Sequence, residues 1–252
     1  MPKLSVIVLA KNEERNIREC LERVKWADEA GVIDECSKEK AVEIAAAYTD
    51  KIYTNKMEGF GRQRNFGIEK ASGDWIYFVD ADDRVTDELK DEVQSTIQDP
   101  QYDAYQIYQR SNYLGKWINH CGWYSPVMKL LKKGSARYSE DKAVERPVTD
   151  GEFGYLKNPV DHLGYPDLNT HLRKFVLYTE YEADTIVNKG VEFRWFNIPW
   201  YFIVKPVCKF FYKYLLQQGF RDGVHGLILC MMSAVYMFMV YAAAWEKTKK
   251  NT

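Results

Sequence analysis

The sequence lacks the motifs that identify several common protein classes. Its 252 residues contain no Asn-x-Ser/Thr site, no Walker A phosphate loop, no Gly-x-Gly-x-x-Gly, no Gly-x-Ser-x-Gly and no His-Glu-x-x-His. It also has almost no net charge, −1 from 35 basic and 36 acidic side chains, whereas a general nucleic-acid binder needs a basic surplus. We therefore expect no nucleic-acid partner.

Cysteine is scarce as well. The five cysteines are an odd number, widely scattered, and none of them forms a Cys-x-x-Cys pair. This argues against a disulfide framework and against a zinc site, and it favours a reduced, cytoplasmic chain. The first residues run directly into an apolar segment that is too short for a signal peptide, so we expect no export.

Short apolar runs alternate with helical patterns over the first 80 residues. This pattern predicts strands over 4–10, 31–34, 51–54 and 75–80, with helices over 13–25, 39–48 and 62–71. Asn12 is the expected N-cap of the first helix, and Thr86 that of a helix ending before Pro100. Strands and loops are expected over 103–147, and another helix over 167–189. The alternation predicts an α/β fold, with a parallel sheet covered by helices on both faces.

Polar side chains follow the predicted strands at their carboxyl ends, where α/β sheets bind ligands. The sharpest cluster is Asp80-Ala81-Asp82-Asp83. Three carboxylates at the end of a buried strand repel one another, and a hard divalent cation commonly offsets such repulsion. The alternative is an acidic turn before the helix capped by Thr86, where Asp and Glu are also favoured.

The C-terminal segment, residues 199–252, has a different character. It carries seven basic and two acidic side chains, a net charge of +5, which leaves −6 for residues 1–198. Lys205, Lys209 and Lys213 share one helical face among aromatic residues, a pattern typical of a helix in a membrane interface.

Residues 227–245 follow with no charge at all, which is long enough for a membrane span. Three lysines come next, however, and a single span would place them outside, against the positive-inside tendency. We therefore expect two antiparallel helices that dip into the cytoplasmic leaflet of the inner membrane, making the protein peripheral or monotopic. A buried core helix of a soluble domain is the alternative.

Four stretches of the chain resemble family 2 glycosyltransferases, and within that family the branch of lipopolysaccharide-core β-1,4-glucosyltransferases. They are residues 6–17, 24–29, 59–65 and 71–85, and residues 218–223 and 241–246 resemble the same branch. The resemblance implies a GT-A fold, which is Rossmann-like, and a nucleoside-diphosphate sugar as donor. It also implies a Mg²⁺ or Mn²⁺ ion and inversion at the anomeric carbon by direct displacement.

The same resemblance assigns roles to eight side chains. Asp80 would face the ribose and Asp82 would bind the metal. Arg62 and Arg64 would contact the phosphates, with a solvated helix face as the alternative for each. The nucleoside pocket would be lined by Lys11, Asn12, Glu13 and Asp34.

Inversion also needs a general base that deprotonates the acceptor hydroxyl. In the family this base lies in a Val-His-Glu triplet, which aligns best with residues 143–145. Glu145 is therefore the expected base, and Asp141 is the second candidate. A solvated acidic loop is the alternative for both residues.

The chain departs from the family pattern at three places. Residues 37–41 lack the short Asp and Thr that would cap the next helix, which we expect to loosen the loop beside Asp34. Val144 replaces the histidine of the triplet. Lys129 replaces an arginine, and lysine cannot reproduce a bidentate phosphate contact.

Together these features predict a GT-A domain over 1–198, with a donor half over about 1–100 and an acceptor half over about 101–198, and membrane-associated helices over 199–252. The predicted activity is transfer of a hexose, glucose from UDP-glucose, to a lipid-linked saccharide such as the lipopolysaccharide core. Two alternatives remain open: a polyprenyl-phosphate glycosyltransferase, and a catalytically silent membrane-bound scaffold.

Overall fold

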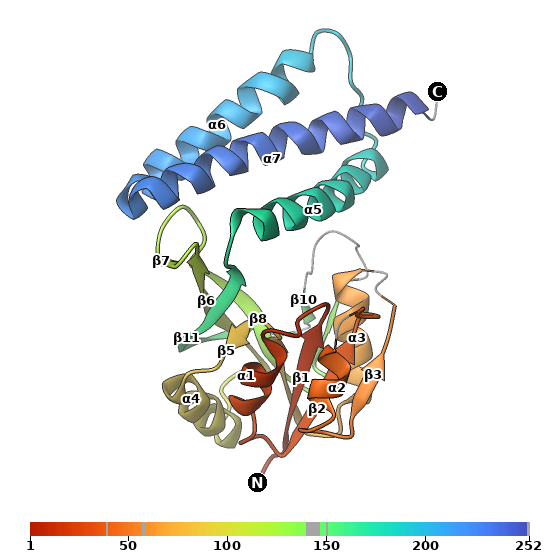
Figure 1. Cartoon of the computed structure of the whole chain (residues 1–252), viewed down its shortest axis with the longest axis vertical. Coiled ribbons are helices and arrows are strands. Elements are labelled where there is room, and N and C mark those ends of the chain that lie inside the picture. Colours follow the sequence, from red (N-terminus) through yellow and green to blue (C-terminus); the bar gives the residue numbers. More distant parts are fainter. Residues whose placement is uncertain (39, 57–58, 140–146, 150, 251–252) are drawn as a thin grey trace. The chain divides into compact units, whose positions relative to one another are not determined.

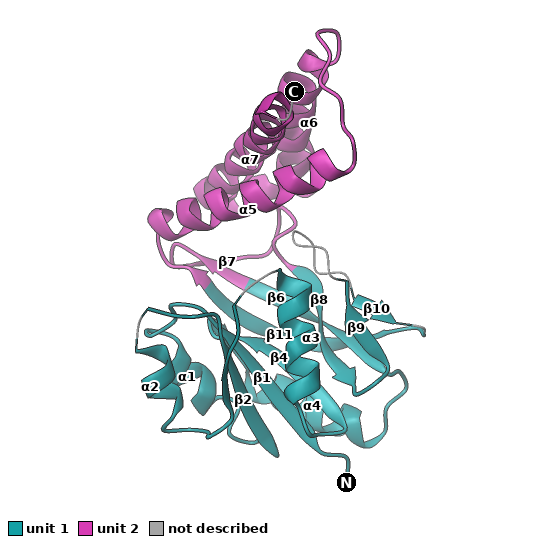
Figure 2. Ribbon diagram, turned by 90° about the vertical axis from the view of Figure 1, so that its right-hand side faces the viewer, with its two compact units in different colours: residues 1–110, 125–163 teal, residues 111–124, 164–252 magenta. Residues whose placement is uncertain are grey.

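The computed structural model describes residues 1–38, 40–56, 59–139, 147–149 and 151–250. The chain forms two compact units, shown in different colours in Figure 2. Unit 1 comprises residues 1–110 and 125–163, and unit 2 comprises residues 111–124 and 164–252. The functional boundary expected near residue 198 stays a prediction.

Nine of the described strands form one mixed sheet in the order β3-β2-β1-β4-β8-β6-β11-β5, with β7 paired to β6. The first four strands of that order are parallel, and the printed pairs beyond them are antiparallel. The strands are β1 (Leu4–Ala10), β2 (Glu29–Asp34), β3 (Ile52–Thr54), β4 (Trp75–Asp80), β5 (Asp83–Arg84), β6 (Ala104–Tyr113), β7 (Lys116–Ile118), β8 (Ser125–Lys132) and β11 (Gly154–Tyr165). A separate antiparallel pair consists of β9 (Ala136–Tyr138) and β10 (Pro147–Thr149).

Helices cover both faces of the sheet in unit 1, as predicted (Figure 1). Successive side chains of a strand point to opposite faces, so Val6 and Val8 of β1 belong to one core and Ile7 to the other. The first core includes α1 (Ile17–Glu22), α2 (Ala41–Ala45) and α4 (Asp87–Gln98), and the second includes α3 (Phe60–Lys70).

One predicted helix cap is confirmed and another is wrong. The Thr86 hydroxyl accepts a hydrogen bond from the Leu89 N–H at the start of α4. Asn12, by contrast, does not cap a helix. It has a φ of 54°, and α1 begins only at Ile17, after a turn in which the Asn16 N–H donates to the Glu13 carbonyl. The Asn12 side chain instead contacts the loop after β2.

Unit 2 is mainly helical. It contains α5 (Leu168–Asn188), which Asp167 caps, then α6 (Lys205–Phe211) between two π-helical segments (Trp200–Val204 and Tyr212–Leu216), a 3₁₀ turn (Gly219–Asp222) and α7 (Gly223–Lys250). The Phe202 and Phe238 rings lie 5.6 Å apart, and the Lys205 Nζ donates to the Tyr241 hydroxyl at 2.7 Å. Nearer the turn, Phe210 and Tyr214 pack in the cluster that contains Leu229 and Cys230. Because later residues of the first helix contact earlier residues of the second, the two C-terminal helices are antiparallel, as predicted.

The turn between these helices is unusually close. A Cβ atom at Gly226 would lie 1.9 Å from the Gly219 carbonyl oxygen, so no larger residue fits there without movement. The helical segment Gly219–Lys250 is long and apolar enough to cross a membrane by length and composition. Only 22% of its most apolar window is buried within the protein.

Candidate active site

Three parallel strands of unit 1 end in polar residues at one edge of the sheet. Ala10 pairs with Asp34 across β1 and β2, and Leu9 pairs with Asp80 across β1 and β4. Lys11, which follows β1, places its Nζ 3.7 Å from a carboxylate oxygen of Glu35. The parallel register therefore gathers at this edge the strand ends that we expected to form the nucleoside pocket.

Hydrogen bonds hold the loop that follows β2. The Ser37 N–H donates to Asp34 Oδ2 at 2.9 Å. The Asn12 N–H donates to the Ser37 hydroxyl at 2.9 Å, and the Lys38 N–H donates to Asn12 Oδ1 at 3.0 Å. The loosening that we expected here is not seen at Ser37 and Lys38. The loss of the helix cap is real, because Lys40 makes no side-chain cap bond at the start of α2.

Asp34 offers an oxygen for a ligand. The residue is 2% exposed, and its Oδ1 is buried with no hydrogen-bond partner among the described residues. A buried carboxylate oxygen without a donor is unfavourable, so an N–H or O–H group of a ligand would stabilise it. Next to it, burial raises the pKa of the Glu35 carboxyl to about 7, against the opposing charge of Lys11.

A buried network of ion pairs holds the first aspartate of the acidic cluster. Lys129, on β8, is fully buried, and its Nζ donates to Asp80 Oδ2 at 2.8 Å and to Asp83 Oδ2 at 2.5 Å. Arg64, on α3, approaches Asp80 Oδ1 at 3.3 Å, with its guanidinium 5.2 Å from the Phe78 ring centroid. Fixed cations therefore neutralise this part of the cluster.

The pKa values follow from these contacts. Burial favours the neutral form of Asp80, but the charges of Lys129 and Arg64 outweigh it and hold the pKa of this carboxyl well below its ordinary value. Burial likewise opposes the charge of Lys129, but Asp80 and Asp83 raise the pKa of its ammonium group well above the usual range. Both partners are ionised at neutral pH.

This network changes two interpretations made from the sequence. The repulsion that we expected a metal to offset is already offset at Asp80 and Asp83 by Lys129 and Arg64. Lys129 replaces an arginine of the family pattern, and its Nζ donates to the carboxylates of Asp80 and Asp83. Of the two arginines expected at the phosphates, Arg64 contacts Asp80, and Arg62 lies exposed on α3.

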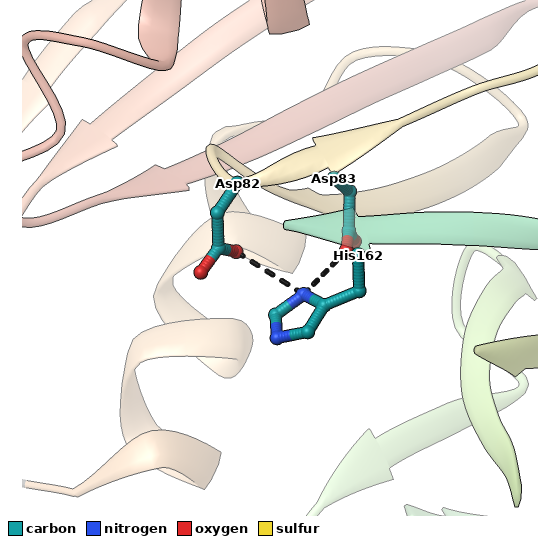
Figure 3. A group of neighbouring side chains, drawn as sticks. All are labelled: Asp82, Asp83 and His162. Atoms are coloured by element: carbon teal, nitrogen blue, oxygen red, sulfur yellow. Dashed lines mark hydrogen bonds and ion pairs between the residues drawn. The ribbon is translucent and has the colours of Figure 1, made fainter. Parts of the chain in front are cut away.

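Asp82, Asp83 and His162 form a group that fits a divalent cation (Figure 3). Each is buried and offers one ligand atom, and these atoms lie within 4.8 Å of one another. His162 Nδ1 lies 3.0 Å from Asp83 Oδ1 and 3.4 Å from Asp82 Oδ1. Pairing of β5 with β11 sets His162 opposite Asp83. Two carboxylates and an imidazole form a donor set that suits Mn²⁺, and carboxylates also suit Mg²⁺.

The sequence interpretation missed His162, and it missed the pairing of Lys129 with Asp80 and Asp83. Both lie on strands, and the signal that marks His162 is the alternation of β11, in which Leu156, Val160 and His162 are buried at every second position. Lys129 stands inside the apolar run Met128–Leu131, where an inward-pointing cation indicates a buried acidic partner.

The remaining predicted residues are placed as follows. Glu13 accepts a hydrogen bond from the Asn16 side-chain amide at 2.6 Å. Lys11 is exposed at the rim of the loop. Glu145, the expected general base, and Asp141, the second candidate for that role, lie outside the described residues.

Comparison with known proteins agrees with this geometry. The family model for glycosyl transferase family 2 matches residues 5–164. The lipopolysaccharide core biosynthesis glycosyltransferase LpsC of Rhizobium meliloti is 23% identical, with 98% of this chain and 94% of LpsC covered.

Two solved structures share the fold. The mannosyltransferase PcManGT of Pyrobaculum calidifontis, solved with GDP-Man and Mn²⁺, superposes with a TM-score of 0.58 at 12% identity, covering 97% of this chain and 87% of that one. TarS of Staphylococcus aureus, solved with UDP-GlcNAc, gives a TM-score of 0.52 at 18% identity, covering 96% and 83%. Since the family model spans more than half of the sequence, the protein belongs to glycosyl transferase family 2 and is a glycosyltransferase with the GT-A fold.

Proposed function

We propose that the protein transfers a hexose, glucose from UDP-glucose, to a lipid-linked saccharide acceptor such as the lipopolysaccharide core, with inversion at the anomeric carbon. The observation that carries this proposal is the single sheet edge that joins an unpartnered buried oxygen of Asp34 to the Asp82, Asp83 and His162 group. The similarity to LpsC supports the acceptor class.

The nucleoside half of the donor would lie against the ends of β1 and β2. Asp34 Oδ1 would accept a hydrogen bond from the base or the ribose, because that oxygen has no donor among the described side chains. Asn12 holds the loop that shapes this pocket through its bond to the Lys38 N–H. Lys129 and Arg64 keep Asp80 ionised and fixed in position, so that it could accept a hydrogen bond from a ribose hydroxyl.

Asp82, with Asp83 and His162, would hold Mg²⁺ or Mn²⁺. When bound, such an ion supplies Lewis-acid stabilisation of the negative charge that develops on the departing diphosphate. His162 Nδ1 lies 3.0 Å from Asp83 Oδ1, and Lys129 holds the other oxygen of Asp83. Lys129 would thus fix one proposed ligand from outside the group.

The transfer step needs a base on the face of the sugar opposite the diphosphate. In the proposed reaction Glu145 takes the proton of the acceptor hydroxyl as its oxygen bonds to the anomeric carbon. The bond from that carbon to the diphosphate oxygen breaks, and its electron pair leaves with the nucleoside diphosphate. Asp141 is the second candidate for this base.

We also propose that unit 2 attaches the protein to the cytoplasmic face of the inner membrane. Its support is the net charge of +5 over residues 199–252, together with exposed apolar side chains on both antiparallel helices, Ile203 and Phe211 on one and Val235 and Phe238 on the other. A lipid-linked acceptor would then be met at the membrane surface.

The donor site is tested by thermal unfolding with UDP-, GDP-, ADP- and CMP-sugars, with and without Mn²⁺, because a ligand that binds only the folded state raises the unfolding temperature. We expect UDP-glucose to stabilise the native protein in the presence of Mn²⁺ and not to stabilise Asp82→Asn. Folded protein that no donor stabilises would contradict the proposal and favour the silent scaffold.

The acceptor class is tested by Glu145→Gln. Loss of a general base should reduce transfer to a saccharide hydroxyl by about a hundredfold or more. Asp141→Asn, the matched control, should reduce it less. A lipid phosphate is already ionised, so unchanged transfer in Glu145→Gln would instead favour a polyprenyl-phosphate acceptor.

A further inference from the structure

Unit 2 contains a cavity of about 240 Å³ that the donor site does not use. Its lining comes from Trp123 and Tyr165, from α5 and α7, and from the helical segment around α6. Three of the lining side chains are Lys174, Lys209 and Lys213, all half-buried. None of the described residues that line the cavity is an aspartate or a glutamate.

Two of these lysines contact neutral groups. The Lys213 Nζ donates to the Cys121 carbonyl oxygen at 2.6 Å, and the Lys174 Nζ lies 4.9 Å from the Tyr165 ring centroid. Lys209 precedes Lys213 by one helical turn, so both ammonium groups belong to the same helical face. Burial lowers the pKa of Lys213 below its ordinary value, and the charge of Lys209 acts in the same direction.

Lys209 and Lys213, one helical turn apart at a cavity with no carboxylate in its described lining, repel each other and lose hydration. A bound anion would relieve both effects. Lysine ammonium groups bind phosphate as point charges, and basic pockets between apolar helices suit lipid head groups. The volume is below that of a site for a drug-sized ligand and fits a compact head group.

The surroundings of the cavity favour an amphiphile over a free ion. The helices that line it also expose large apolar side chains to solvent, including Val207 and Phe211 before the turn, and Met231 and Val235 after it. A soluble phosphate would leave this apolar surface exposed. A lipid would place its phosphate among the lysines and its acyl chains along the helices.

We propose that this cavity binds the phosphate group of an anionic membrane lipid. The inference rests on the proposed attachment of unit 2 to a membrane, and it adds a specific site to that attachment. It concerns residues of unit 2 alone.

The test uses the full chain in uncharged detergent micelles and measures thermal unfolding during titration with dihexanoyl phosphatidylglycerol. We expect saturable stabilisation. In Lys209→Gln/Lys213→Gln the apparent dissociation constant should rise about tenfold or more, since each lysine near an anionic head group contributes about 1 kcal/mol. Lys249→Gln/Lys250→Gln, which removes the same charge outside the cavity, should change it less than about twofold.

Lys209→Gln alone keeps the hydrogen bond from Lys213 to Cys121, so it tests the cavity even if the double variant does not fold. It should weaken lipid binding about threefold to fivefold. Equal weakening by the cavity pair and the control pair would overturn the proposal, because it would indicate diffuse attraction. Equal stabilisation by inorganic phosphate, or by dihexanoyl phosphatidylcholine, would also overturn it.

Two further readouts in the same preparations separate this inference from the proposed function. Stabilisation by UDP-glucose with Mn²⁺ reports the donor site, and it should persist in Lys209→Gln/Lys213→Gln. Flotation with vesicles of neutral phosphatidylcholine reports attachment through the apolar helices. Donor binding and flotation without selective phosphatidylglycerol binding would overturn the cavity proposal alone, whereas selective lipid binding without donor binding would uphold it and contradict the proposed activity.

Discussion

The lysines removed from solvent in the two units differ in whether a carboxylate balances their charge. In unit 1, Lys129 is fully buried and lies between two carboxylates, at 2.8 Å from Asp80 and 2.5 Å from Asp83. In unit 2, Lys209 and Lys213 are half-buried beside a cavity whose described lining has no acidic residue. A cation that is balanced inside the fold serves structure, whereas a cation that lacks an internal counter-ion is available to a ligand.

The largest effect that would sharpen this comparison is expected from Lys129→Met. It leaves Asp80 and Asp83 as buried carboxylates without their shared cation, so the free energy of unfolding should fall by about 3–5 kcal/mol. Urea titration of the native protein and the variant measures this loss of unfolding free energy. Lys132→Met removes an exposed lysine that pairs with Asp103, and the change there should be below about 1 kcal/mol. If Lys129→Met and Lys132→Met lost equal unfolding free energy, the buried ion pairs of Lys129 would not contribute more than an exposed pair.

Glu35 of unit 1 is a carboxyl whose burial outweighs its pairing with Lys11. Its pKa is about 7 in the folded protein and near 4.5 when unfolded. The folded state therefore binds the proton more tightly, and the free energy of unfolding should fall as pH rises from about 4.5 to 7, by at most about 3 kcal/mol. Thermal unfolding at several pH values should show this in the native protein and less of it in Glu35→Gln. A pH slope unchanged by that substitution would exclude Glu35 as its source.

Unit 2 also contains a buried charged group with partners inside the fold, the carboxylate of Asp222. It accepts hydrogen bonds from the His120 N–H at 2.9 Å and contacts His120 Nδ1 at 3.1 Å. Asp222→Ala should lower the free energy of unfolding by about 2 kcal/mol, because the His120 N–H loses its acceptor. Asp184→Ala, which removes a more exposed partner of Lys247, is the control and should change it by less than about 1 kcal/mol.

The smallest effect concerns helix caps, which lie outside the charge networks. Thr86→Ala should lower the free energy of unfolding by about 1 kcal/mol, because the Leu89 N–H at the start of α4 loses its acceptor. Thr86→Ser keeps the hydroxyl and should restore most of that loss in the same urea titration. If Ser behaved like Ala, the cap bond would not be the cause.

The parallel strands of the first 80 residues and the helices on both faces follow from local patterns, and the sequence predicts them. The strand bounds of β1 and β4 agree with the prediction, because buried parallel strands are continuous apolar runs. Asn12 was misassigned because its side chain bonds to Lys38, 26 residues away, and that contact overrides its local capping preference.

The candidate site is predictable only in part. Asp34, Asp80 and Asp82 follow from strand ends, since parallel strands bring those ends to one edge. The pairing of Lys129 with Asp80, and of His162 with Asp83, joins residues 49 and 79 positions apart. Such pairs depend on the antiparallel strands β8 and β11, whose register no local pattern fixes.

Neither unit is a continuous stretch of sequence, and this limits how the protein can be divided. The chain enters unit 2 over residues 111–124, returns to unit 1 over residues 125–163 and then enters unit 2 again. Tyr113, Ile118 and Cys121 share a core with Leu229 and Cys230. A deletion that begins near residue 199 would strip those early residues of their packing partners. Helix exchange between relatives would need a matched 111–124 hairpin, so the C-terminal helices and this hairpin are expected to evolve as one heritable module.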